Sequence, residues 1–193
     1  MAITDRTLEL VSETTGVEPV TLAEMKSHLR VVTTGDNDYI SELIKVARRQ
    51  VETDARRKYV KSTFALRLGE FPTCDEIMLE NPTVASISSI TYTNSTGGTS
   101  TLSTSTYELD KHEAPGHARL KYGQSWPATR VIQNAVTVNF ISGSTSASDT
   151  PVEAKHAIKL LVADMYCDRG SDGTASNRAY NDLIGMFRWG DYR

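Results

Sequence analysis

Some short patterns in this sequence contain the residue types that perform nucleophilic catalysis. Gly123-Gln124-Ser125-Trp126-Pro127 begins like the nucleophile elbow G-x-S-x-G of serine hydrolases. Proline stands at its last position, where a small residue is needed because strand and helix cross closely behind the serine. We therefore expect a turn after a strand, with Trp126 packed against the sheet. A hydrolase that used Ser125 is the enzymatic alternative, and it would need a histidine and an acid close by in the fold.

The candidate metal ligands do not form a recognisable site. Glu153 and His156 have a spacing found in carboxylate metal sites on helices, but such sites need a second copy of the pattern on a facing helix. Residues 168–173 lack the alternating ligands and the closing glutamate of a calcium loop. No cysteine or acidic partner lies at ligand spacing from the other three histidines, His28, His112 and His117. We expect no catalytic, cofactor-binding or metal-binding residues, and no enzyme.

Composition excludes several further classes of protein. The 193 residues carry a formal net charge of −3, so we do not expect the basic surface that grips nucleic acid. No apolar run approaches the ~20 residues of a membrane span, and residues 1–6 do not resemble a secretion signal. Cys74 and Cys167 lie far apart and are expected to be small apolar residues in a reducing compartment.

The two ends of the chain predict helices. Thr21 and Glu24 form a capping box that opens a short helix to about Arg30. A longer helix is expected over about residues 38–58, because apolar residues recur there at steps of three and four: Ile40, Leu43, Ile44, Ala47 and Val51. A second cap is expected at residues 150–153, before a helix that ends near Arg169-Gly170, and a last helix over 177–187.

The middle of the chain predicts about six short strands, as apolar residues alternate there between Gly, Pro and Asn breaks. Ten of the fourteen residues from Thr93 to Thr106 are Ser or Thr, which indicates a hairpin with a polar, exposed face. Leu102 and Tyr107 are its expected inward positions. We therefore expect an α+β fold in which both ends of the chain form a helical core of about four helices and a small antiparallel β insertion lies between them.

Three segments follow from this organisation. Residues 1–62 hold an N-terminal strand or arm and the first two helices, residues 63–148 the β-rich insertion, and residues 149–193 the last two helices and a C-terminal tail. The alternation of Leu8 and Leu10 suggests a strand added to the sheet of a neighbouring copy.

Charged and aromatic clusters in the helical parts are candidates for protein contacts. The basic pairs of the long helix are interleaved with acidic residues, which fits either a solvated face or contact with an acidic partner. Three aromatic residues, Phe187, Trp189 and Tyr192, end the chain. They either fold back on their own core or anchor to another protein, since Trp and Tyr are favoured at interfaces.

Four segments of the chain carry the resemblance to a known family: PVTLAEMKSHLR at 19–30, DYI to ARRQVE at 38–52, YGQSWPATR at 122–130 and TPVE to DMY at 150–166. With this order and spacing, residues 17–187 resemble the head–tail connector (adaptor) proteins of long-tailed bacteriophages. The resemblance implies a ring-forming structural protein of the virion neck, assembled in the host bacterial cytoplasm. The ring, expected to be a dodecamer, would lie beneath the portal protein and extend the DNA channel. DNA would pass through its lumen without sequence-specific binding, and a stopper, head-completion or tail protein would attach to it.

The resemblance also assigns expected contact residues. Docking on the portal is carried over to the C-terminal segment, with Phe187, Arg188, Trp189, Tyr192 and Arg193 as the contacts. Packing between subunits is expected to use Arg48, Arg49, Glu52 and Arg56. A different class of function stays open, a β-rich binding module or another phage tail or baseplate protein, and a monomer would favour the binding module.

Overall fold

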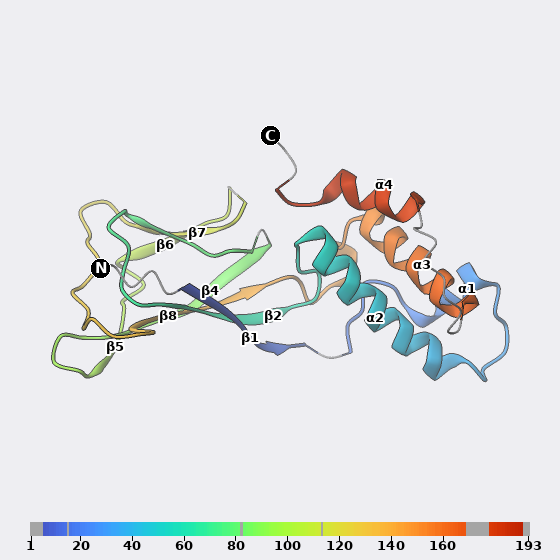
Figure 1. Cartoon of the computed structure of the whole chain (residues 1–193), viewed down its shortest axis with the longest axis horizontal. Helices are drawn as coiled ribbons and strands as arrows, with labels where there is room; N and C mark the ends of the chain where they lie inside the picture. The colour runs from blue at the N-terminus through green and yellow to red at the C-terminus, as the bar shows by residue number, and fades with distance from the viewer. Residues whose placement is uncertain (1–5, 15, 82, 113, 169–177, 191–193) are drawn as a thin grey trace. The chain divides into compact units, whose positions relative to one another are not determined.

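The structure, a computed structural model of the chain, describes residues 6–14, 16–81, 83–112, 114–168 and 178–190. The chain divides into two compact units, a β unit (Met1–Thr14 and Lys61–Gly143) and a helical unit (Thr15–Val60 and Ser144–Arg193). The expected fold class is confirmed: the ends of the chain supply the helices and the middle supplies antiparallel sheets (Figure 1). Among the described residues, no helix is both long and apolar enough to cross a membrane.

The helical unit is built from four helices in its described part. They are α1 (Leu22–Leu29), α2 (Asn37–Ala55), α3 (Val152–Cys167) and α4 (Arg178–Phe187), with a short 3-10 turn at Ala147–Asp149. The capping box of α1 is confirmed, since the Thr21 hydroxyl accepts from the backbone N–H of Glu24 and the Glu24 carboxylate accepts from that of Thr21. The apolar stripe of α2 packs mainly against α3.

Two helix ends differ from the expected ones. Helix α2 ends at Ala55 rather than near Lys58, because Arg56 adopts a left-handed conformation with φ of 53° and closes the helix. Helix α3 begins at Val152 after an N-cap at Pro151, and no side chain caps it, so the capping box expected at residues 150–153 does not form. The described part of α3 ends at Cys167, and the expected end at Arg169-Gly170 lies outside the described residues.

The β unit contains two antiparallel sheets. Their strands are β1 (Arg6–Glu13), β2 (Ser62–Leu68), β3 (Glu76–Met78), β4 (Val84–Thr93), β5 (Thr99–Thr101), β6 (Tyr107–Asp110), β7 (His117–Leu120) and β8 (Val136–Ser142). The larger sheet has the order β1-β2-β8-β4-β5 and the smaller one β3-β7-β6. The central strand β8 alternates between buried and half-buried residues and contributes Val136, Val138 and Phe140 to the core. This alternation is the period of two that a sheet with one buried face requires.

The N-terminal strand corrects one expectation. Strand β1 pairs with β2 of its own chain over Arg6 to Glu13, rather than with the sheet of a neighbour. Segment 1–14 therefore belongs to the β unit, although it is separated from β2 in sequence by the first two helices. The register skips Val11, which is the extra residue of a bulge between Leu10 and Ser12.

The hairpin and the loop before β8 agree with the sequence. Leu102 and Tyr107 are buried, while most residues of the Ser/Thr-rich hairpin are exposed. Trp126 stacks on Phe71 with ring centroids 5.0 Å apart and an interplanar angle of 4°, and its indole N–H donates to the carbonyl of Cys74 at 2.9 Å. Cys74 and Cys167 are both exposed, which corrects the expectation that they serve as small apolar packing residues.

Candidate functional site

The C-terminal ends of α2 and α4 meet on the helical unit, and we call this region the C-terminal face: residues 53–56, 180–185 and 187–190. Arg188 continues the bonding pattern of α4, since its backbone N–H donates to the carbonyl of Ile184 at 2.9 Å. The next residue crosses to the other helix, where the N–H of Trp189 donates to the carbonyl of Ala55 at 3.0 Å. The tail and the end of α2 are therefore joined by a backbone hydrogen bond.

A buried ionic cluster supports this face from inside the unit. Arg48 lies on α2 and is only 2% exposed, and its guanidinium bonds the carboxylates of Glu18 at 2.8 Å and Glu52 at 3.0 Å. Glu52 also receives the Lys58 ammonium at 2.8 Å. Its other oxygen accepts the backbone N–H groups of the two residues that follow Lys58, at 2.9 and 3.2 Å. The cluster thus fixes the chain as it leaves α2.

The four residues expected at a subunit contact fall into two pairs. Arg48 and Glu52 are 2% and 3% exposed and make their bonds inside the helical unit, so neither side chain offers a surface to a partner. They lie on the apolar side of α2, not on the charged side where their type suggested. Arg49 and Arg56 are exposed, and only they among the four can reach a neighbouring molecule.

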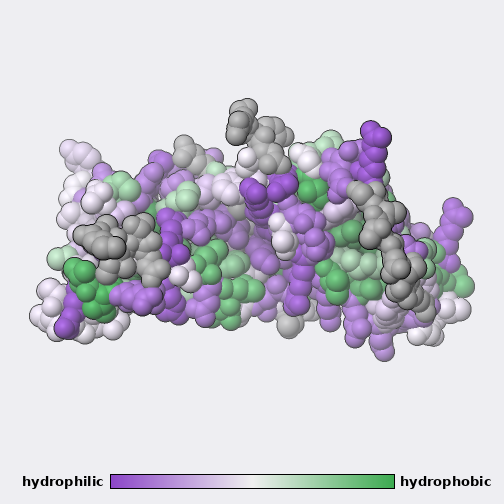
Figure 2. Space-filling view, in the orientation of Figure 1, coloured by the Kyte–Doolittle hydropathy of each residue, from purple (hydrophilic) through white to green (hydrophobic). Residues whose placement is uncertain are grey.

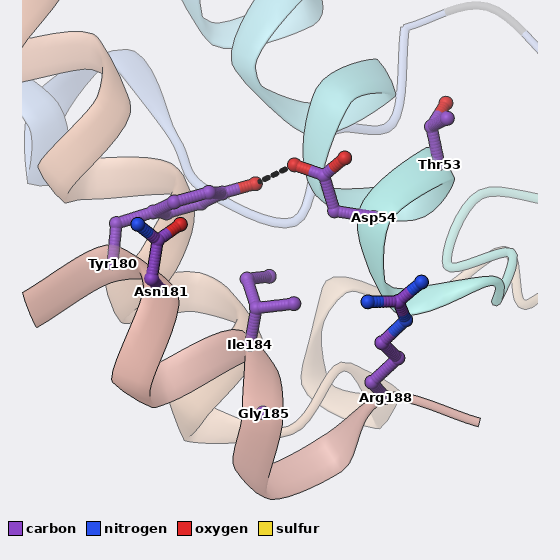
Figure 3. Close-up of a pocket in the computed structure, with 7 residues that line it drawn as sticks. All are labelled: Thr53, Asp54, Tyr180, Asn181, Ile184, Gly185 and Arg188. Atoms are coloured by element: carbon purple, nitrogen blue, oxygen red, sulfur yellow. Dashed lines mark hydrogen bonds between the residues drawn. The ribbon is translucent and has the colours of Figure 1, made fainter. Parts of the chain in front are cut away.

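A pocket of about 510 Å³ opens between the two helices of the C-terminal face. Thr53 and Asp54 line it from α2, and Arg188 borders it beyond the end of α4. From α4 it is lined by Tyr180, Asn181, Ile184 and Gly185. Figure 3 shows the Asp54 side chain pointing from α2 toward the Tyr180 hydroxyl, and Ile184 on α4 between Tyr180 and Arg188.

One side of this pocket is held by a tyrosine–carboxylate hydrogen bond. The Tyr180 hydroxyl donates to Asp54, which also accepts from the side-chain amide of Gln50 at 2.9 and 3.0 Å (Figure 3). Burial, together with this bond to an acceptor that is negatively charged, raises the pKa of Tyr180 well above its ordinary value. The hydroxyl therefore stays protonated and keeps Asp54 oriented.

The tail residues predicted to dock on a portal are partly placed. Phe187 packs half-buried against the core of the helical unit, and Trp189 is half-buried beside the end of α2. Arg188 borders the pocket. Tyr192 and Arg193 lie outside the described residues. Of the two behaviours open to this segment, its described part folds back on its own unit.

The sequence patterns considered for catalysis or metal binding do not form a site among the described residues. Ser125 is exposed in the loop before β8. Glu153 and His156 are both exposed on α3. Within the part of the chain that the structure describes, no group of three or more His, Cys, Asp or Glu could hold a metal ion. Residues 169–173 of the pattern considered as a calcium loop lie outside that part.

Comparison with known families finds a match to part of the chain. A family model described as phage gp6-like head-tail connector protein matches residues 19–111, which include α1, α2 and the first strands of the insertion. The resemblance inferred from the sequence is therefore confirmed. The matched description is that of a connector and names no enzymatic activity. Comparison with curated proteins finds no match.

Solved structures share the fold over nearly the full length of the chain. A chain in the neck of an empty GTA particle, computed with C6 symmetry, superposes with a TM-score of 0.75 at 20% identity, covering 94% of this chain and 95% of the other. A chain of the native gene transfer agent (GTA) virion gives 0.73 at 21% identity, with 94% of each chain covered. A chain from the native GTA neck, computed with C12 symmetry, gives 0.69 at 22% identity and covers 92% and 93%.

Proposed function

We propose that this protein, similar to phage gp6-like head-tail connectors, forms a ring in a virion neck, where it lies beneath the portal and extends the DNA channel. The observation that carries the proposal is the fold match over 94% of the chain to a neck protein, joined to the connector family match over residues 19–111. Both units are included in that coverage, so the likeness is not limited to a common submotif.

The number of subunits in the proposed ring is twelve. One of the similar neck chains comes from a particle computed with C12 symmetry, and a dodecamer suits that symmetry. A ring of this kind uses a heterologous contact, in which two different surfaces of one chain meet and the rotation closes. The net charge of −3 suits a lumen through which DNA passes, because each added Lys or Arg contact to phosphate would slow it.

The portal contact is assigned to the C-terminal face. Its tail is fixed to the end of α2 by the bond from Trp189 to Ala55, so the face is organised before a partner arrives. The pocket beside Arg188 can receive a side chain of the portal, and exposed Arg56 adds a second cationic group. The opposite side of the ring would then be the platform for a stopper or tail protein, with assembly in the host bacterial cytoplasm.

Mass in solution tests this function. The full chain is measured by light scattering alone and mixed with the cognate portal, and a ring-sized species is expected in one of the two samples. Deletion of residues 188–193 should abolish binding to the portal and leave the helical core folded, because Phe187 and its packing are kept. A matched control, Glu153→Ala on the exposed start of α3, should bind normally. A monomer that ignores the portal would overturn the proposal.

A further inference from the structure

Two arginines that follow α2 lack an acceptor within the described part of the chain. Arg56 is exposed and Arg57 is half-buried, and neither guanidinium makes a hydrogen bond or an ion pair with another described residue. The Nε of Arg57 is itself buried and has no hydrogen-bond partner there. A buried donor without an acceptor costs free energy, and an acceptor brought by a partner removes that cost.

These arginines lie where the tail meets α2. A Cβ atom added to Gly190 would lie 3.3 Å from Nη1 of Arg56, so this guanidinium borders the tail directly after Trp189. Figure 2 shows mainly hydrophilic surface around the C-terminal end of α2. The unsatisfied cationic groups therefore belong to the same surface as the C-terminal face.

The acidic residues of the C-terminal face already have donors. Both carboxylate oxygens of Asp54 accept from the side-chain amide of Gln50, and one of them also accepts from the Tyr180 hydroxyl. The carboxylate of Asp182 lies 3.7 Å from Nε of Arg178, one turn earlier on α4. The acids of this surface are thus engaged while two of its cations are not, so the group that would complete it is an anion.

The dipole of α2 does not account for Arg57. A helix favours cations beyond its last turn, and exposed Arg56 satisfies that preference while remaining in water. The attraction to the dipole does not require a guanidinium with a buried Nε. Lys58, which follows Arg57, shows the alternative, because its ammonium is half-buried and bonds Glu52 at 2.8 Å.

A carboxylate of a protein suits this surface better than the phosphates of DNA. Duplex DNA carries one negative charge for every ~1.7 Å of its axis, so a duplex laid here would also approach the carboxylates of Asp54 and Asp182. A single Asp or Glu side chain can reach the arginines without nearing those acids. The planar guanidinium group also matches a carboxylate, with which it can form two parallel hydrogen bonds.

We propose that the portal binds the C-terminal face through acidic side chains, whose carboxylates bond Arg56 and Arg57. This inference rests on the proposed portal contact and names the chemistry of the partner's surface. The bonds are charge-assisted, and one of them satisfies the buried Nε of Arg57.

Neutral substitution of the two arginines tests the chemistry of the contact. The full chain with Arg56→Gln and Arg57→Gln is compared with the unmodified chain for its Kd for the purified cognate portal, at low and at high salt. We expect binding at low salt to weaken by about tenfold or more. The salt dependence of binding should also become shallower, because salt screens the attraction that the substitutions remove. Urea unfolding of each variant verifies that it is folded.

Lys45→Gln is the matched control. Lys45 is an exposed cation on the same helix, eleven positions before Arg56 and therefore ~16 Å away along the helix axis. The substitution removes one positive charge from α2 and should leave the Kd for the portal unchanged. The single variant Arg56→Gln, at an exposed position, should show part of the loss and keeps the test valid if the double variant fails to fold.

The outcomes separate the acidic contact from the proposed function. Unchanged portal binding by the double variant, while deletion of residues 188–193 abolishes it, would overturn the acidic contact and leave the proposed function intact. Loss of binding to a DNA duplex with portal binding unchanged would also overturn it. So would an equal loss in Asp191→Asn, because it would assign the arginines to the chain's own tail. An unmodified chain that stays a monomer and ignores the portal would overturn both proposals.

Discussion

The backbone N–H of Trp189 donates a hydrogen bond of 3.0 Å to the carbonyl oxygen of Ala55, the last residue of α2. Carbonyls at the end of a helix lack intrahelical partners, and here the tail of the chain supplies one. The two residues are 134 positions apart in sequence. This bond therefore ties the tail to the helix that carries the buried Arg48 cluster.

Replacement of Arg48 by Ala should strongly destabilise the helical unit. It would leave Glu52, which is 3% exposed, with one cationic partner fewer in a buried position, at a cost of about 3–5 kcal/mol. Urea unfolding at pH 7 measures the change. Arg49→Ala is the matched control, because Arg49 is exposed on the same helix and its loss should change the free energy of unfolding by less than about 0.5 kcal/mol. Equal effects of the two substitutions would contradict the assigned roles.

Stability should fall at high pH through Tyr59. Burial raises the pKa of Tyr59 to about 12, whereas an unfolded tyrosine titrates near pH 10. The folded state thus keeps a proton that the unfolded state releases, so the stabilisation is complete below about pH 10 and is lost as the pH rises to about 12. The slope should reach about 1.4 kcal/mol per pH unit. Urea unfolding between pH 8 and 12 measures it.

Tyr59→Phe separates this group from other tyrosines. Its hydroxyl is buried and has no hydrogen-bond partner among the described residues, so the substitution should leave stability at pH 7 unchanged or raise it by up to about 1 kcal/mol. The alkaline loss should become shallower, with the remainder carried by Tyr180, whose pKa is also raised by burial. An unchanged alkaline slope in Tyr59→Phe would show that Tyr59 is not responsible.

Two substitutions of Gly185 should separate stability from portal binding. Gly185 is an exposed position within α4, and an added Cβ would meet nothing within 4 Å. Gly185→Ala should stabilise the protein by about 0.5–1 kcal/mol, because glycine is a poor helix former. Gly185→Trp should remain folded but fill the pocket and abolish co-sedimentation with the portal. If the tryptophan variant binds as well as the alanine variant, the pocket is not the portal site.

The contacts of Trp126 should keep the loop before β8 ordered. Trp126→Ala removes the stacking on Phe71 and the bond to Cys74, and we expect a loss of about 2 kcal/mol because the side chain is half-buried. Hydrogen exchange at the amide of Arg130 should accelerate as well. Ser125→Ala is the neighbouring control and should change neither quantity, since Ser125 is exposed. A protected Arg130 amide in Trp126→Ala would show that other bonds hold the loop.

Local features of the fold could be predicted from the sequence because the residues that decide them are neighbours in the chain. The capping box of α1 depends on Thr21 and Glu24, three positions apart, and it formed as expected. The period of the apolar residues identified α2 and the alternation identified β8. The connector family could be proposed for a related reason, since it is recognised by the order of such local segments.

The candidate site could not be predicted in the same way. Arg48 and Glu52 follow Ile44 at steps of four, so their spacing already placed them with the apolar stripe, but their charge indicated a solvent-facing position. Their burial depends on Glu18, thirty positions before Arg48, and on the turn that follows α2. A charged side chain can be buried at low cost in free energy only when partners such as these surround it. No pattern within one helix reveals those partners.

The sequence by itself determined which segments are helices and strands and that they form an α+β fold, because hydrophobic period and capping act over a few residues. Tertiary structure alone decided that β1 joins β2 of its own chain, that the tail bonds to Ala55 and that a pocket opens beside Asp54. Each of these joins segments tens of residues or more apart, and which distant segments meet depends on how all the buried surfaces are satisfied together.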